Sequence, residues 1–196
     1  MLMEEATTTK IQHYIFGVSK MENLALVINY YGKKNGVEID FTKDVIVMDV
    51  GNGPYISEWN ISDKLPQPSM EELEALEPEA MLYYARKDKL AELERKFNYM
   101  LENGHTTSSF GVEIDANVTS VRNVAGLLVV MGADDKEWFC DYNNQLHELT
   151  RQQVETIQVE IITYIQGLYD QKWVYRNKIN TLTTAEEVNS IVIEFK

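Results

Sequence analysis

Three residues close together in the sequence carry the side chains that nucleophilic catalysis uses: Cys140, Asp141 and His147. An imidazole can take the proton of a thiol, and a carboxylate can orient the imidazole. Adjacent residues of a strand point to opposite faces, however, so Cys140 and Asp141 are expected to diverge. No nucleophile elbow or oxyanion pattern accompanies the three residues. We therefore interpret Cys140 as a small buried apolar residue and His147 as a residue that flanks a turn.

Metal and phosphate sites are not predicted either. The three histidines, His13, His105 and His147, lie far apart, and none has a second ligand at the spacing of a metal site. The acidic run at 70–80, MEELEALEPEA, lacks the alternating aspartates and central glycine of a calcium loop. We interpret it as a solvated face at a helix N-terminus. The glycine pairs at 32–36 and 51–53 are too closely spaced for a phosphate loop, so we expect no catalytic residue, metal or cofactor.

The composition is typical of a folded protein, and its charge excludes polyanionic partners. The chain has 196 residues, with 31 acidic and 18 basic residues and a net charge of -13. Contact with phosphates requires clustered Lys and Arg, so we expect neither nucleic acid nor a membrane as a partner. The single cysteine excludes an intrachain disulfide and fits a reducing compartment. No signal-peptide pattern opens the sequence, and the longest apolar run, 124–131, is far shorter than the roughly 20 residues of a membrane span.

Residues 1–64 are predicted to form a small antiparallel β-rich N-terminal docking domain. Alternating or apolar stretches predict four strands: 11–18, 37–41, 45–50 and 55–61. The last three, with one turn each between them, indicate a meander. Residues 21–36 have two interpretations. A helix over about 21–31 is favoured by the capping pattern of Ser19 and Glu22, and the alternative is a hairpin that turns at Asn35–Gly36.

The clearest boundary in the sequence lies at Pro66 and Pro68, because two prolines favour extended backbone and remove hydrogen-bond donors. We expect a linker and a short helix at 65–78. Ser69 and Glu72 form a capping box at the start of that helix. Pro78 is expected to end it and to begin the next helix as its first residue.

Residues 79–196 are predicted to form a mainly helical C-terminal domain, which makes the fold class α+β. A helix over 79–102 ends at Asn103–Gly104, a β segment covers 105–114, and Asp115 or Asn117 caps a helix that ends near 131. A two-strand hairpin follows, formed by 138–141 and 145–148 around Asn143–Asn144. A long helix then begins at the capping box Thr150–Gln153, and a last box, Thr183–Glu186, begins a short helix.

Aromatic residues are the most informative feature of the long helix. Tyr169 and Trp173 lie about one turn apart and off its main apolar stripe. They either pack under the helix at 79–102 or form a second apolar face that is buried against another subunit, where Trp and Tyr are enriched. Tyr55 and Trp59, which alternate onto one strand face, are the other interface candidates.

Five segments follow one another in order across residues 79–190: ARKDKLAELERKFN, GHTTSSFGVEID, NVTSVRNVAGLLVV, WFCDYNNQ and RNKINTLTTAEEV. In the order and spacing of these segments, the residues resemble a domain-of-unknown-function family found in bacteriophage tail and tail-fibre proteins. An Asn-rich turn ahead of a Leu-Thr helix start is typical of the family. This chain departs from it in its last helix, which is rich in Ile and Tyr where the family is rich in Ala.

The resemblance implies a virion component or an assembly factor, and no enzyme activity. We therefore expect a non-enzymatic structural component of a phage tail, baseplate or tail-fibre attachment apparatus that acts through protein–protein contacts. Its expected partners are other phage tail or fibre proteins and further copies of itself, in a homo-oligomer. Its expected location is the virion tail, after synthesis in the cytoplasm of the bacterial host. The alternative is a tail-fibre assembly chaperone that is absent from the mature virion.

Overall fold

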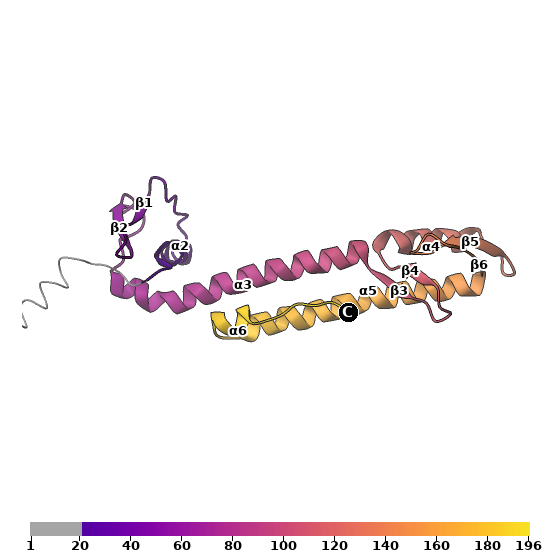
Figure 1. The fold of residues 1–196 in the computed structure, drawn as a ribbon. Coiled ribbons are helices and arrows are strands. Elements are labelled where there is room, and N and C mark those ends of the chain that lie inside the picture. The colour runs from indigo at the N-terminus through magenta and orange to yellow at the C-terminus, as the bar shows by residue number, and fades with distance from the viewer. Residues whose placement is uncertain (1–20) are drawn as a thin grey trace, which may run out of the picture. The chain divides into compact units, whose positions relative to one another are not determined.

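The computed structural model describes residues 21–196 (Figure 1). The chain divides into two compact units, of which the first ends at Ala85 and the second covers Arg86–Lys196. Helices mixed with short antiparallel strand pairs confirm the α+β class. The predicted strand at 11–18, the capping residue Ser19 and His13 lie outside the described residues.

The first unit contains the helix α2 (Leu24–Lys34), which resolves the choice between helix and hairpin in favour of the helix. Its buried residues Leu24, Val27 and Ile28 recur at helical spacing and face one core. The helix ends where Gly36 adopts a positive φ of 71°, a conformation that glycine adopts without steric cost. The other buried members of this core come from elements later in the unit: Ile39, Val45, Ile61, Leu65, Leu73 and Ala80.

The strands β1 (Val45–Asp49) and β2 (Pro54–Trp59) pair antiparallel, with a register shift between Ile46 and Val47. One carboxylate organises their turn, because Asp49 Oδ1 accepts the amides of Gly51 at 2.7 Å and Gly53 at 3.2 Å. The predicted strand at 37–41 is wrong, and with it the three-strand meander among the described residues. Asp40 instead closes a local turn, in which its Oδ1 accepts the amide of Thr42 at 2.9 Å.

The helix α3 (Met70–Asn103) begins at the predicted capping box, where Ser69 and Glu72 exchange hydrogen bonds. The predicted break at Pro78 is wrong, since the helix continues through it. Tertiary contacts on either side of the proline offset its missing N–H. Leu73 and Ala80 are fully buried, and Glu79 accepts from the Tyr30 hydroxyl and from Lys34 Nζ, both at 2.7 Å.

The division between the two compact units lies within α3, at Ala85 and Arg86. The sequence placed a linker earlier, at 65–78. Leu65 and Leu73 of that stretch are buried in the core of the first unit. The stretch therefore packs as part of a folded unit in this structure.

The second unit continues with two short hairpins and three helices. The elements are β3 (His105–Thr107), β4 (Glu113–Asp115), α4 (Val118–Val130), β5 (Lys136–Cys140), β6 (Leu146–Thr150), α5 (Arg151–Thr181) and α6 (Ala185–Asn189). The β segment predicted at 105–114 is thus a hairpin, which turns at Gly111 with a φ of 85°. The caps at Asn117 and Thr150 are confirmed. The last capping box lies one residue later than predicted, at Thr184 and Glu187.

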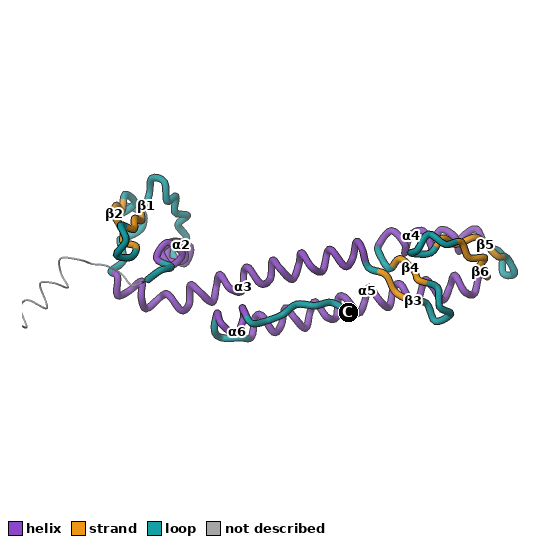
Figure 2. The backbone as a smooth tube through the Cα atoms, in the orientation of Figure 1, coloured by secondary structure: helices purple, strands orange, loops and turns teal. Residues whose placement is uncertain are grey.

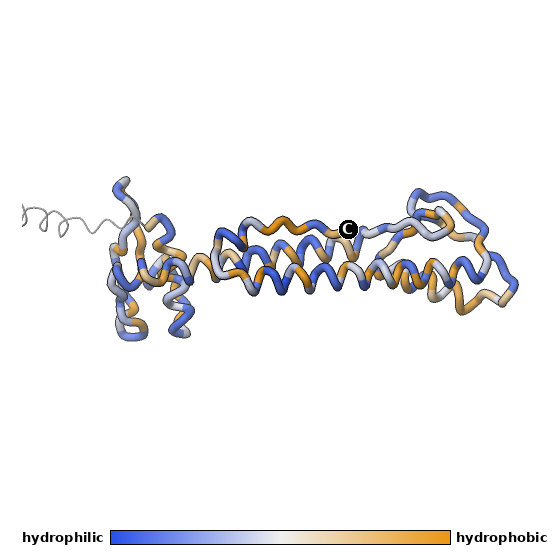
Figure 3. The backbone as a smooth tube through the Cα atoms, turned by 90° about the horizontal axis from the view of Figure 1, so that it is seen from below, coloured by the Kyte–Doolittle hydropathy of each residue, from blue (hydrophilic) through white to orange (hydrophobic). Residues whose placement is uncertain are grey.

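The long helix α5 organises the core of the second unit. Its first half buries Val154, Ile157 and Ile161 in a cluster with residues in or next to β4, α4 and β6: Ile114, Ala116, Val124, Met131 and Leu149. Its second half buries Leu168 and Ile179. Apolar residues recur at intervals along the helices of this unit (Figure 3), as amphipathic helices require.

The segment after α6 runs without strand structure beside α5 (Figure 2). Side chains of two helices hold it. Lys96 Nζ of α3 donates to the Ile193 carbonyl at 2.9 Å, and the Tyr175 hydroxyl of α5 donates to the Glu194 carbonyl at 3.0 Å. Arg86 donates to the Asn180 and Leu182 carbonyls, which lie at the C-terminal end of α5. These bonds satisfy carbonyls that the helix and the extended segment leave unpaired.

Candidate functional site

The turn between β5 and β6 brings together two of the three residues that the sequence proposed for nucleophilic chemistry. Asp141 Oδ2 lies 2.8 Å from His147 Nε2. The other carboxylate oxygen, Oδ1, accepts the backbone amides of Asn143 and Gln145, each at 2.8 Å. All of these contacts lie within one tight turn, where Asn144 has a φ of 60°. Asp141 is therefore the residue that shapes the turn.

Cys140 does not join this pair. In the hairpin register, His147 lies opposite Phe139, whereas Cys140 lies opposite Leu146. Directly opposed residues share a face and neighbours alternate, so the thiol and the imidazole are on opposite faces of the hairpin. Cys140 is also exposed, which corrects the expectation of a buried cysteine. The hairpin has only two strands, and its outer face is open to solvent at this position.

The charge state of the turn follows from its hydrogen bonds. The Gln145 amide, with His147 and the Asn143 amide beside it, holds the pKa of the Asp141 carboxyl below its usual value. The carboxylate form is the one that accepts three bonds at once, so the turn is most stable when Asp141 is charged. With the thiol on the other face, Cys140 is not placed for His147 to activate it.

His105 lies in a second contact, between the two hairpins of the unit. Its ring stacks on Tyr142 at 4.3 Å between centroids, and its Nδ1 lies 3.6 Å from Glu113 Oε2. The Tyr142 amide donates to the Glu113 carbonyl at 3.0 Å. The Asp141 turn is thereby attached to β4. Residues 21–196 contain no group of three His, Cys, Asp or Glu side chains that could hold a metal ion.

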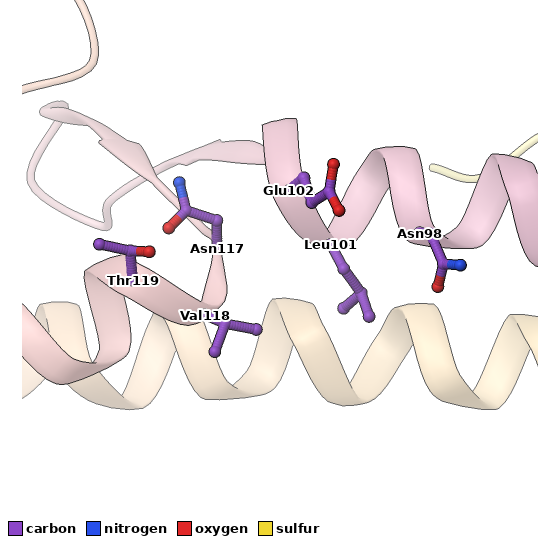
Figure 4. A pocket seen from close by; sticks show the side chains of 6 residues that line it. All are labelled: Asn98, Leu101, Glu102, Asn117, Val118 and Thr119. Atoms are coloured by element: carbon purple, nitrogen blue, oxygen red, sulfur yellow. The ribbon is translucent and has the colours of Figure 1, made fainter.

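An open pocket of about 380 Å³ lies between the last turns of α3 and the start of α4 (Figure 4). Glu102 is the one titratable residue among its lining, which also includes Asn98, Leu101, Asn117, Val118 and Thr119. Asn117 is already engaged, since its Oδ1 accepts the Ser120 amide at 2.9 Å as the helix cap. The pocket therefore offers neither paired acid–base groups nor a cation for an anionic ligand.

The acidic run and the glycine turns also have structural roles. Glu72 caps α3, and Glu79 pairs with Lys34 at 2.7 Å. The amides of Gly51 and Gly53 bond to Asp49 of their own turn. The sequence interpretation expected a solvated face at a helix N-terminus for the acidic run. Glu72 fits the position at the helix start, whereas Glu79 makes tertiary contacts with Lys34 and Tyr30.

The interface candidates of the first unit differ in their surroundings. Trp59 packs against the first core, and its Nε1 donates to the Leu65 carbonyl at 2.9 Å. Its polar group is therefore satisfied within the chain. Tyr55 lies opposite Met48 in the hairpin and is half-buried.

Tyr169 and Trp173 on α5 were expected either to pack under the helix at 79–102 or to form a second apolar face, and the structure shows part of each. Tyr169 packs its ring against Phe97 of α3, with centroids 4.9 Å apart, yet 40% of the residue is exposed. Trp173 is 57% exposed, and the guanidinium of Arg176 lies 5.6 Å from its ring. One edge of Tyr169 is thus covered within the chain, while most of Trp173 faces solvent.

Sequence reasoning missed other exposed apolar residues on the same helix. Val159, Ile162 and Val174 are each at least half exposed. The signal was present, because Val159, Ile162, Tyr169 and Trp173 are separated by three, seven and four residues, a helical spacing separate from that of the buried stripe. The sequence interpretation considered only the aromatic residues of α5 and therefore missed the aliphatic residues beside them.

Two family models match the chain, and they divide it at the same place as the structure. Residues 38–85 match the XkdW protein family, a phage-associated family, and the match ends where the first unit ends. Residues 84–193 match a domain of unknown function, DUF4376. No curated protein and no solved structure matches the chain.

The resemblance predicted for residues 79–190 is confirmed at the level of an uncharacterised domain family with a phage link. The phage link comes from the match over the first unit. Because the match over 84–193 spans more than half of the 196 residues, the chain belongs to the family of the domain of unknown function DUF4376.

Proposed function

We propose that this protein is a structural component of a bacteriophage tail, baseplate or tail-fibre attachment apparatus, and that it acts through protein–protein contacts without catalysis. The phage-associated match over residues 38–85 supports the viral assignment. The tail location rests on the resemblance of residues 79–190 to domains of tail and tail-fibre proteins.

The observation that carries the proposal is the amount of apolar side chain that the second unit leaves exposed. Large exposed apolar residues lie on α4, on the β5–β6 hairpin and on α5: Val129, Val130, Trp138, Leu146, Val159, Ile162, Trp173 and Val174. Tryptophan exposed on a surface is enriched where proteins bind one another. The side chains of Asp141, Asn117 and Thr150 in the same unit are used within its turns and caps, which favours a binding role over a chemical one.

The non-enzymatic role is supported by the geometry of the β5–β6 hairpin, which separates the exposed thiol of Cys140 from His147. If the proposal is correct, Cys140→Ser leaves every activity of the protein unchanged. A loss of function in this variant with an unchanged fold would show that the thiol does chemistry.

The proposed partners are other tail or fibre proteins and further copies of this chain. The net charge of -13 disfavours binding to nucleic acid and to anionic membranes. No helix within residues 21–196 is long and apolar enough to cross a membrane.

A genetic experiment tests the proposal. A stop codon early in the reading frame, placed in the phage that encodes the chain, is expected to abolish plaque formation and to give particles with an incomplete tail or fibre in electron micrographs. Wild-type protein and the Cys140→Ser variant, supplied from a plasmid, should restore plaques equally. Normal particles in the absence of the protein would overturn the structural role.

A tail-fibre assembly chaperone would give the same genetic result. It differs in its fate, because a chaperone acts during assembly and leaves the particle. The acidity of the chain and its long amphipathic helices suit such a role as well. Analysis of the protein content of finished virions distinguishes the two.

A further inference from the structure

An open groove of about 590 Å³ lies in the second unit, between α3 and the segment that follows α6. Pockets that bind ligands in other proteins have volumes of roughly 300–1,000 Å³, so the groove is large enough for one. Its helix wall is formed by Arg95, Lys96, Tyr99 and Met100, and residues 193–196 form the other wall. The bonding of the second wall determines what the groove can bind.

That segment is extended, with side chains and backbone groups that alternate in direction. Ile191 and Ile193 are buried, whereas Val192 between them is 68% exposed. Both backbone groups of Glu194 bond to the Tyr175 hydroxyl of α5, the carbonyl at 3.0 Å and the amide at 3.1 Å. The N–H and C=O of one residue therefore lie on the same edge of the segment, as they do in a β-strand.

The other edge of the segment faces α3, and its bonds to that helix end at Ile193. Lys89 Nζ donates to the Ile191 carbonyl at 3.1 Å, and Lys96 Nζ donates to the Ile193 carbonyl at 2.9 Å. Phe195 is the next residue on this edge. Its N–H and its C=O have no hydrogen-bond partner within the described part of the chain. The groove thus contains a free backbone donor and acceptor at strand spacing.

The helix wall adds a free cation and apolar surface. Arg95 is exposed and forms no hydrogen bond or ion pair with any other described residue. Lys96 lies beside it and pairs with Glu92 at 3.0 Å. Tyr99 is 64% exposed. Glu194 has the one acidic side chain of the lining, so the groove has more cationic than anionic side chains although the whole chain carries a net charge of -13.

We propose that this groove binds an extended peptide segment of a partner protein, with a carboxylate side chain of the peptide on Arg95. The peptide backbone pairs with the free N–H and C=O of Phe195, as a strand adds to an open sheet edge. A simple organic anion could use the guanidinium, but it would leave the backbone pair unused. The inference rests on the proposed role in protein–protein contacts, and it adds a site and the chemistry of the partner.

The spacing of the helix wall determines the spacing of the peptide's side chains. Arg95 and Tyr99 are four residues apart, which is about one turn and roughly 6 Å along α3. Two residues of an extended chain advance about 6.6 Å and return to the same face. A carboxylate two residues from an apolar side chain therefore matches both groups. Because the contact covers only a few peptide residues, we expect a Kd of about 0.1–5 mM.

NMR titration of the isotopically labelled full chain with a blocked tripeptide tests the site. The probe is acetyl-Glu-Ala-Leu-amide, and acetyl-Gln-Ala-Leu-amide is the control that lacks only the charge. Peptide is added to about 10 mM, which exceeds the expected Kd. The amide resonances of Phe195 and of α3 around Tyr99 should shift and saturate. The Phe195 amide should also exchange more slowly with solvent when the Glu peptide is bound, because it then has an acceptor.

Arg95→Gln and Lys87→Gln provide a matched pair of variants. Each removes one exposed cation from α3, but Lys87 lies outside the groove lining. The Glu peptide should bind Lys87→Gln as tightly as the wild type and should bind Arg95→Gln about two- to fivefold more weakly, which is the usual effect of an exposed ion pair. The Gln peptide should bind the wild type and Arg95→Gln equally. Both positions are exposed, so the spectra outside the groove should stay unchanged.

The absence of saturable shifts with either peptide would overturn the proposal. A loss of affinity in Arg95→Gln that is the same for both peptides would also overturn it, because the guanidinium would then not pair with the carboxylate. Saturable shifts confined to other parts of the chain would place the binding elsewhere. These measurements use the purified chain alone, so their failure and the failure of the phage role can be told apart.

Discussion

Gly104 is the position where one added methyl group tests the packing of the second unit most sharply. It follows the last residue of α3, and a Cβ at this position would lie 2.7 Å from Tyr164 Cε1 and 2.5 Å from the Met100 carbonyl oxygen. Both distances are shorter than any ordinary contact of a carbon atom. Gly104→Ala therefore forces the end of α3 away from α5, or it displaces the Tyr164 ring.

The expected cost follows from this overlap. Extra methyl groups in a well-packed region cost about 1–3 kcal/mol. Tyr164 cannot yield freely, since it packs against the apolar cluster of the unit, and burial raises the pKa of its hydroxyl. For a unit of this size, 1 kcal/mol corresponds to roughly 4 °C in Tm. We expect Gly104→Ala to lower the Tm of the second unit by about 4–12 °C.

Calorimetry of Gly104→Ala against Gly126→Ala measures this effect. Gly126 lies within α4, and a Cβ there would meet no atom within 4 Å. Replacing a helical glycine with alanine in open space stabilises by about 0.5–1 kcal/mol, so Gly126→Ala should raise the Tm. Tyr164→Ala should reduce the cost of Gly104→Ala, because it removes one of the two overlaps. A Gly104→Ala protein as stable as the wild type would refute the close approach of α3 and α5.

Two further predictions concern the start of α5 and the turn before it. Thr150→Ala removes the cap that accepts the Gln153 amide and should cost about 1 kcal/mol in urea unfolding. Thr163→Ala, an exposed control within the same helix, should change stability by less than about 0.5 kcal/mol. Asp141 has a lowered folded-state pKa, so its contribution to stability is present above the ordinary carboxyl pKa and is lost as pH falls through the lowered value. Unfolding midpoints measured from pH 7 to pH 2 should therefore fall less in Asp141→Asn than in the wild type, and parallel curves would contradict this role.

The helix starts could be predicted from the sequence because their signals are local. Ser69, Asn117 and Thr150 each bond to an amide only three residues away, so the sequence neighbourhood contains the whole interaction. The turn at Asn143–Asn144 is equally local. These features predicted most of the second unit's order of elements.

The errors occurred where distant residues decide the structure. Pro78 remains within α3 because Tyr30 and Lys34, more than forty residues away, bond to Glu79 beside it. Residues 37–41 alternate as a strand does, yet Asp40 and Asp44 close a local turn, and no neighbouring strand pairs with them among the described residues. Alternation alone does not supply a ladder partner.

The residues of the candidate chemical site could likewise be predicted only where their contacts are local in sequence. Asp141 and His147, close in sequence, do lie together, and the hairpin register places Cys140 on the face opposite His147. Which face of the hairpin is covered depends on the packing of the second core, so the exposure of Cys140 could not be predicted. The exposed apolar residues Val159 and Ile162 of α5 were missed for the same reason, because only the packing shows that they are exposed.

The central claim is that this protein is a built-in part of the phage particle, and the protein content of purified virions tests it most directly. Particles of the encoding phage are banded twice on a density gradient, and peptides of this chain are quantified by mass spectrometry against those of the major capsid protein. We predict that the chain is present at the same ratio in every particle fraction and is enriched in isolated tails. Its absence from particles that contain all other tail proteins, with the chain abundant in the lysate, would contradict the structural role and favour the chaperone.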